Sequence, residues 1–142
     1  MNLLVASERR WLDVTVGVLL SSLLLFGSLY IIRLNNDSRE QQFDNELAMR
    51  GQRVSTEQGC VACHTVDGSL GIGPSWKGMM GRTEVMRSGT VVTVDEAYFR
   101  ESLTDPSRKQ VASYPNVMSR YFLEEDEIVA LLEFARQLSL VE

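Results

Sequence analysis

The most chemically specific residues of this chain lie in one pentapeptide, Cys60-Val61-Ala62-Cys63-His64. It contains both cysteines and the only histidine of the 142 residues. Two thiols about one helical turn apart can form thioether bonds to both vinyl groups on one edge of a haem, and a histidine directly after them can reach the iron. The pattern therefore indicates one covalently attached haem c, with Cys60 and Cys63 as attachment sites and His64 as the proximal iron ligand.

The same cysteine and histidine count argues against other kinds of site. A structural zinc site needs a second pair of cysteine or histidine ligands, and a thioredoxin-like redox pair needs a βαβ context. The sequence shows neither. A disulfide across so short a loop is rare. Because His64 is the only histidine, a bis-histidine haem is excluded, so the sixth iron ligand is a methionine, a less common group, or absent.

The N-terminal part of the chain contains a candidate membrane anchor. Residues 14–32 (VTVGVLLSSLLLFGSLYII) carry no charge and are long enough to span a bilayer as a helix. Trp11 and Tyr30 lie near the two ends, where amphipathic rings favour the headgroup level. A cleaved signal peptide is the alternative, but its apolar region is usually shorter and no small-residue cleavage site follows this one. We therefore expect residues 1–34 to be retained as an anchor.

The positive charges beside the anchor do not determine its orientation. Arg9 and Arg10 precede it, whereas Arg33 and Arg39 follow it, so the positive-inside rule gives nearly a tie. Haem c is attached on the periplasmic or equivalent outer side of a membrane. We therefore expect a single-pass protein of the bacterial cytoplasmic membrane, with a cytoplasmic N-terminus and a periplasmic or otherwise extracytoplasmic haem domain.

A polar segment and one helical domain follow the anchor. Residues 35–45 contain no glycine or proline, which is compatible with a helical extension or with a short flexible tether. Residues 46–142 have room for one modest domain with a single haem. Apolar periodicity predicts helices over residues 46–58, 95–103 and 125–138. The expected fold class is all-α, with one N-terminal transmembrane helix.

Local signals define the regions between these helices. Residues 77–89 read as irregular, and Thr93 with Glu96 predicts a capping box that opens the second helix. Gly51 lies inside the first helix, where glycine costs up to about 1 kcal/mol relative to alanine. Close crossing by another helix would explain this glycine, and so would simple tolerance near a helix start.

The segment that follows the haem motif contains three candidates for supporting roles. A ligating histidine usually donates its second N–H to a fixed acceptor, and the carbonyl of Pro74 is the candidate here. Trp76 could cover a haem face and bond a propionate, which is also compatible with an ordinary core aromatic. Arg82 could pair with a propionate, although an exposed arginine is the commoner explanation.

A methionine is the expected sixth ligand, and the chain has six. A core role is the default for any one of them. Spacing does not exclude Met79, Met80 or Met86. Met118 follows Pro115 in a stiffened loop just before the last helix, so it can approach the haem face opposite His64. We therefore predict Met118 as the sixth ligand.

Five motifs spread over the outer domain carry a family resemblance. Between about residues 46 and 138 the chain resembles the class I cytochrome c fold, and most of all the cytochrome c domain fused to subunit II of certain bacterial haem-copper oxidases. The matching stretches are GCVACHTVDGS (59–69), GIGPSWKGMMGR (71–82), VDEAYFRESLTDP (94–106), YPNVM (114–118) and EEDEIVALLEFARQL (124–138).

The resemblance implies specific roles for several residues. It implies thioether bonds at Cys60 and Cys63, axial ligation by His64 and Met118, and Pro74 as the acceptor for the histidine. It also implies that Gly51 packs against Phe134 where the first and last helices cross.

Three features depart from the family pattern. Ser119 stands where proline often follows the ligating methionine, and Ser113 where glycine often precedes the tyrosine. The chain also has no spare cysteine or histidine for the copper centre that subunit II carries. We therefore expect a cytochrome module on its own anchor and not subunit II itself.

These expectations together predict an electron carrier, not an enzyme. A haem with histidine and methionine ligands has no open position for a small-molecule substrate, and the methionine raises its reduction potential. We expect electrons to pass from a quinol-oxidising complex towards a haem-copper terminal oxidase, with the chain as a subunit of a larger membrane complex. The net charge of −5 gives no reason to expect nucleic-acid binding, and it predicts docking by apolar contact around the haem edge.

Two alternatives from other classes remain at this point. One is the haem c subunit of an enzyme resembling nitric-oxide reductase, which shares the layout of anchor and cytochrome. The other is a gas-binding sensor with five-coordinate haem, which requires that Met118 does not bind iron.

Overall fold

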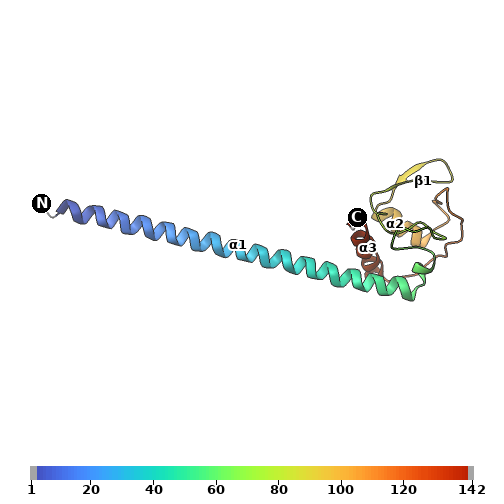
Figure 1. Cartoon of the computed structure of the whole chain (residues 1–142), viewed down its shortest axis with the longest axis horizontal. Helices are drawn as coiled ribbons and strands as arrows, with labels where there is room; N and C mark the ends of the chain where they lie inside the picture. The colour runs from blue at the N-terminus through green and yellow to red at the C-terminus, as the bar shows by residue number, and fades with distance from the viewer. Residues whose placement is uncertain (1–2, 141–142) are drawn as a thin grey trace. The chain divides into compact units, whose positions relative to one another are not determined.

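The computed structural model describes the backbone of residues 3–140 and the side chains of residues 15–140 (Figure 1). The chain divides into two compact units, one ending at Gln42 and the other beginning at Phe43. The fold is mostly helical with little strand, which confirms the expected all-α class. The elements, in order, are α1 (Leu3–Glu57), the 3₁₀ turn η1 (Cys60–Ala62), β1 (Thr83–Val85), β2 (Val91–Thr93), α2 (Glu96–Thr104) and α3 (Glu125–Leu140).

The first unit contains the N-terminal part of α1, and the described side chains in it, from Thr15 to Gln42, are nearly all exposed. From Thr15 onward this helix is long and apolar enough to cross a membrane, and none of its most apolar stretch is buried in the protein. Three serines within the stretch, at positions 21, 22 and 28, donate their hydroxyl protons to carbonyls of the preceding turn. In this stretch the hydroxyls of the three serines are hydrogen-bonded within the helix, and the large aliphatic side chains are exposed. The side chains of Trp11, Arg9 and Arg10, used above to judge the ends of the anchor, lie outside the described residues.

Residues 35–45 are helical, which agrees with a helical extension of the anchor and not with a flexible tether. They form part of α1, which runs without interruption from Leu3 to Glu57. The absence of glycine and proline from this stretch explains why the helix continues through it.

The second unit has a core formed by the last turns of α1 together with α2 and α3. Ala48, Val54, Phe99, Leu131 and Leu132 are among its buried side chains. In α3, fully buried residues recur at helical spacing along one side, as the apolar periodicity predicted. The helix continues two residues beyond the expected end at residue 138.

Gly51 marks the crossing of α1 and α3. A Cβ atom added there would clash with the carbonyl oxygen of Ala130 and would lie 2.8 Å from the Cβ of Phe134. The predicted contact between Gly51 and Phe134 is therefore confirmed, and close approach of the two backbones explains why glycine stands in this helix.

Replacing Gly51 by alanine should lower the free energy of unfolding by about 1–3 kcal/mol, because the helices must separate to admit the methyl group. Thermal or denaturant unfolding of the haem-loaded protein measures this. Gln52→Ala, at an exposed neighbouring position of the same helix, is the control and should change stability little. A Gly51→Ala protein as stable as the parent, as helix propensity alone would favour, would contradict a close helix crossing.

The start of α2 differs from the expectation. Asp95 is the N-cap, and its Oδ1 accepts a hydrogen bond of 2.7 Å from the backbone N–H of Tyr98. The predicted capping box of Thr93 and Glu96 is wrong. Thr93 belongs to β2, where it pairs with Thr83, so the strand must end before the helix can begin.

Part of the region expected to be irregular forms a short hairpin. β1 and β2 are antiparallel, with Glu84 opposite Val92. An isolated bridge between Met86 and Val111 joins the hairpin to the segment that precedes Met118. Two backbone hydrogen bonds support this bridge, from Arg87 N to Gln110 O at 2.7 Å and from Ala112 N to Val85 O at 2.8 Å. The hairpin and the segment around Val111, which are distant in sequence, therefore lie side by side.

Candidate haem site

The Cys60–His64 segment forms a tight turn directly after α1. The backbone N–H groups of Cys63 and His64 both donate to the carbonyl of Cys60, at 3.1 and 2.9 Å. Both cysteines are free, with Cys60 buried and Cys63 half-buried. Burial raises the pKa of the Cys60 thiol. The turn thus holds two unpaired thiols and the histidine within a few residues, as covalent haem attachment requires.

The ring of His64 is fixed by a single acceptor. Its Nδ1 lies 2.8 Å from the carbonyl oxygen of Pro74. A carbonyl can only accept, so Nδ1 carries the proton and Nε2 is left with a lone pair for a metal. Burial lowers the pKa of His64, with the Pro74 bond opposing this in part, which favours the neutral ligating form. The contact expected between His64 and Pro74 is present.

Gly73 allows the histidine to occupy this position. A Cβ at Gly73 would lie 2.6 Å from Cε1 and 2.9 Å from Nδ1 of His64. Any side chain there would displace the ring, so the glycine before Pro74 is part of how the histidine is placed.

Trp76 lies close to the histidine and belongs to the core. It is 4% exposed, and its ring centroid is 5.6 Å from that of His64. It also makes edge contacts with Phe99 and Phe134. Its backbone N–H donates to Thr65 O at 2.8 Å, which ties the loop back to the histidine segment. The two sequence interpretations, core aromatic and haem neighbour, are compatible because Trp76 also lines the cavity described next.

A mainly apolar cavity connects these residues with Met118. Its walls come from the Cys60–His64 turn, the loop around Pro74 and Trp76, β1, α2 and residues 106–121. Both cysteines, the histidine and a methionine therefore line one space, and the residues present fit a haem c. Haem c supplies a one-electron iron couple when bound.

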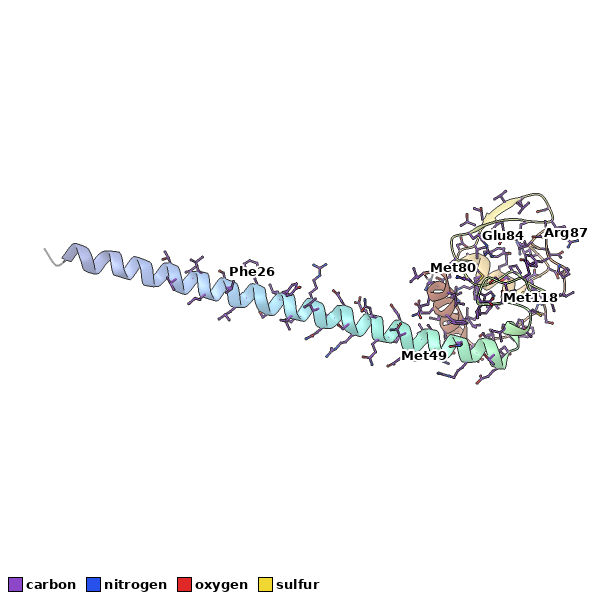
Figure 2. All side chains as sticks on the ribbon, in the orientation of Figure 1. Phe26, Met49, Met80, Glu84, Arg87 and Met118 are labelled. Carbon is purple, nitrogen blue, oxygen red and sulfur yellow. The ribbon has the colours of Figure 1, made fainter. Side chains whose placement is uncertain are left out.

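Only two of the methionines with described side chains line this cavity, Met79 and Met118. Met86 is buried elsewhere in the core, and Met49 is 54% exposed on α1 (Figure 2). Met79 belongs to the loop that contains Trp76, to which its backbone N–H is bonded at 3.2 Å. Met118 comes from a separate segment. The cavity therefore narrows the candidates for the sixth iron ligand to two methionines. Met79 lies on the loop that contains Trp76, and Met118 lies on a separate segment.

The segment around Met118 is attached mainly at its ends. Arg87 donates to the carbonyl of Tyr114 at 3.1 Å, and Tyr121 N donates to Leu103 O at 2.8 Å. Within the described chain, no backbone hydrogen bond involves residues 115–120. The segment is therefore held by side-chain packing against the core, which includes Met118 itself, and by an ion pair of 3.9 Å between Arg120 and Asp105.

Arg82 lines the cavity but is engaged by the protein. Its Nε lies 2.7 Å from Oε1 of Glu84, and its two terminal nitrogens donate to the carbonyls of Ser75 and Lys77 at 3.3 and 3.5 Å. Its side chain is half-buried, so the interpretation as an ordinary exposed arginine does not describe it. Pairing with a propionate stays a prediction.

Sequence reasoning missed Glu84 and the tyrosines of the cavity wall. Glu84 and Tyr98 both line the cavity. Burial raises the pKa of Tyr98, and the nearby carboxylates of Glu84 and Glu101 add to this. The alternation Thr83-Glu84-Val85 is a weak signal for an inward glutamate, but only once residues 83–85 are known to form a strand.

A turn with two thiols and a histidine beside an apolar cavity is typical of proteins that carry a covalently attached haem. The cytochrome c family model matches residues 48–139, more than half of the chain, and the chain belongs to that family. No curated protein matches the chain significantly. Membership confirms the class I cytochrome c domain, the haem c cofactor and a role as a haem-based electron carrier.

Proposed function

We propose that this chain is a membrane-anchored, non-catalytic carrier of single electrons, moving them from a quinol-oxidising complex towards a haem-copper terminal oxidase. The observation that carries the proposal is the cavity that His64 and Met118 both line, with Nδ1 of His64 already bonded to Pro74. If His64 and Met118 both held the iron, no coordination position would remain for a substrate. Electron exchange without bond rearrangement is the chemistry that such a site supports.

The apolar part of α1 supports a membrane location. Its side chains are exposed, and in water a stretch of this length would be strongly unfavourable. We propose that residues 1–34 anchor the chain in a bacterial cytoplasmic membrane with the N-terminus in the cytoplasm. The haem domain is then extracytoplasmic, on the side where haem c is attached.

Apolar contact with the partner is supported by two residues at the cavity. Ile72 and Val117 both line it and are 53% and 63% exposed. Exposed aliphatic side chains beside a redox centre allow close approach of another protein without strong charge pairing. The resemblance to the domain fused to oxidase subunit II favours a haem-copper oxidase as acceptor, with the chain as a subunit of a larger membrane complex.

The route of the electrons can be tested in membranes that contain the full-length chain, by following the haem absorbance. We expect a quinol to reduce the haem and oxygen to reoxidise it. Cyanide, which blocks haem-copper oxidases, should hold it reduced. An inhibitor of quinol oxidation should hold it oxidised.

Two results would contradict this route. Unchanged reoxidation by oxygen in cyanide would exclude a haem-copper oxidase as acceptor. Reoxidation that requires nitric oxide would instead indicate a subunit of an enzyme resembling nitric-oxide reductase.

A further inference from the structure

Glu84 is a carboxylate that faces the domain from the short strand β1. Its side chain is 17% exposed, whereas its strand neighbours Thr83 and Val85 are exposed. Carboxylates are seldom removed from water unless they are paired. Because Glu84 also lines the haem cavity, its placement calls for a functional explanation.

Arg82 is the partner that neutralises Glu84. The ion pair is 2.7 Å long, and Arg82 is itself 35% exposed. The two remaining nitrogens of the guanidinium bond the carbonyls of Ser75 and Lys77, at 3.3 and 3.5 Å. Glu84 fixes one edge of the guanidinium, and the fixed guanidinium holds the loop on either side of Trp76.

The loop that Arg82 holds is the one that orients the proximal histidine. Ser75 follows Pro74, whose carbonyl accepts the proton of His64 Nδ1. The Oγ of Ser75 also donates to Thr65 O at 3.0 Å, directly after the histidine. A continuous series of contacts therefore runs from Glu84 through Arg82 to Ser75, and from there to Thr65 and to Pro74, the acceptor of the His64 bond.

We propose that Glu84 is a positioning residue that holds Arg82 against the carbonyls of Ser75 and Lys77 and cancels its charge in the cavity wall. The pair thereby sets the reduction potential of the haem. This proposal rests on the proposed function, since it concerns a haem ligated by His64. In this arrangement Arg82 acts on the site as half of a neutral pair.

The two halves of the pair have opposite expected effects. Reduction adds an electron to the cavity, so an uncompensated positive charge in its wall favours the reduced form and an uncompensated negative charge disfavours it. Glu84→Gln leaves Arg82 unpaired. It should raise the ratio of reduced to oxidised haem at a fixed solution potential by up to about tenfold, which is ~59 mV for one electron. Arg82→Gln should lower the ratio.

The test is a redox titration of the full-length, haem-loaded protein and its variants at one pH. Glu133→Gln is the matched control, because Glu133 is similarly buried at 15% exposure, pairs with Arg136 at 3.6 Å, and is not part of the cavity wall. It removes the same charge from the protein and should leave the potential close to that of the parent. The double variant Arg82→Gln with Glu84→Gln restores a neutral wall and should lie between the two single variants.

The proposal is overturned if Glu84→Gln behaves like Glu133→Gln, or if both single variants shift the potential in the same direction. Should Glu84→Gln fail to mature, Arg82→Gln and the double variant decide. The double variant must then have the higher potential of the two. Spectra recorded on the same samples report whether sulfur binds the iron. A parent protein without sulfur ligation would contradict the proposed function, and this result is distinct from the effect of Glu84 on the potential.

Discussion

Replacing Met118 by alanine is expected to open the sixth coordination position while the domain stays folded. The weak charge-transfer band between sulfur and ferric iron at the red end of the spectrum should disappear. The reduced protein should then bind carbon monoxide. Loss of the thioether should also lower the reduction potential by more than about 59 mV, a tenfold change in the ratio of reduced to oxidised haem.

Met79→Ala is the matched control for this prediction. Met79 lines the same cavity and is 7% exposed, so the control also removes a methionine from the cavity wall. It should retain the sulfur band and should not bind carbon monoxide. If Met79→Ala lost the band and Met118→Ala kept it, the ligand would come from the loop that contains Trp76.

Replacing Gly73 by alanine should disrupt iron ligation by His64 without removing the attachment sites. The added Cβ would lie 2.6 Å from the ring, so the ring has to shift, and we expect its 2.8 Å bond to Pro74 to be lost. Loss of such an orienting partner typically weakens ligation about 10- to 100-fold. A high-spin fraction should therefore appear in the electron paramagnetic resonance spectrum of the ferric protein.

Ile72→Ala provides the control for the Gly73 prediction. Ile72 is adjacent in sequence and 53% exposed, and its replacement should leave the iron low-spin. A fully low-spin Gly73→Ala protein would show that the ring has room to move and that the close packing of Gly73 against His64 has no role in ligation.

The sequence predicted the parts of the site that depend on residue type and local spacing. The attachment turn at Cys60–His64 is local, and the Pro74 acceptor is only ten residues from the histidine. The contact of Gly51 with Phe134 was predicted as well, although only through the family resemblance. Helix positions followed from apolar periodicity, because each helix buries one side in a single core.

What the sequence did not predict depends on tertiary pairing. The Thr93 cap failed because Thr93 is held in a strand by Thr83, a partner that no local pattern identifies. Glu84 was overlooked for the same reason, since a glutamate in an irregular segment would be exposed. Its inward direction exists only because β1 and β2 pair and set which side chains face the domain.

The most direct test of the central claim is the optical spectrum of the full-length protein, isolated in mild detergent and recorded oxidised, reduced, and reduced with carbon monoxide. Coordination of the iron by His64 and Met118 predicts a low-spin c-type spectrum, a sulfur-to-iron band in the oxidised form, and no change on adding carbon monoxide. A protein without covalent haem, or one whose reduced iron binds carbon monoxide readily, would contradict an electron carrier and indicate a site that is open to ligands.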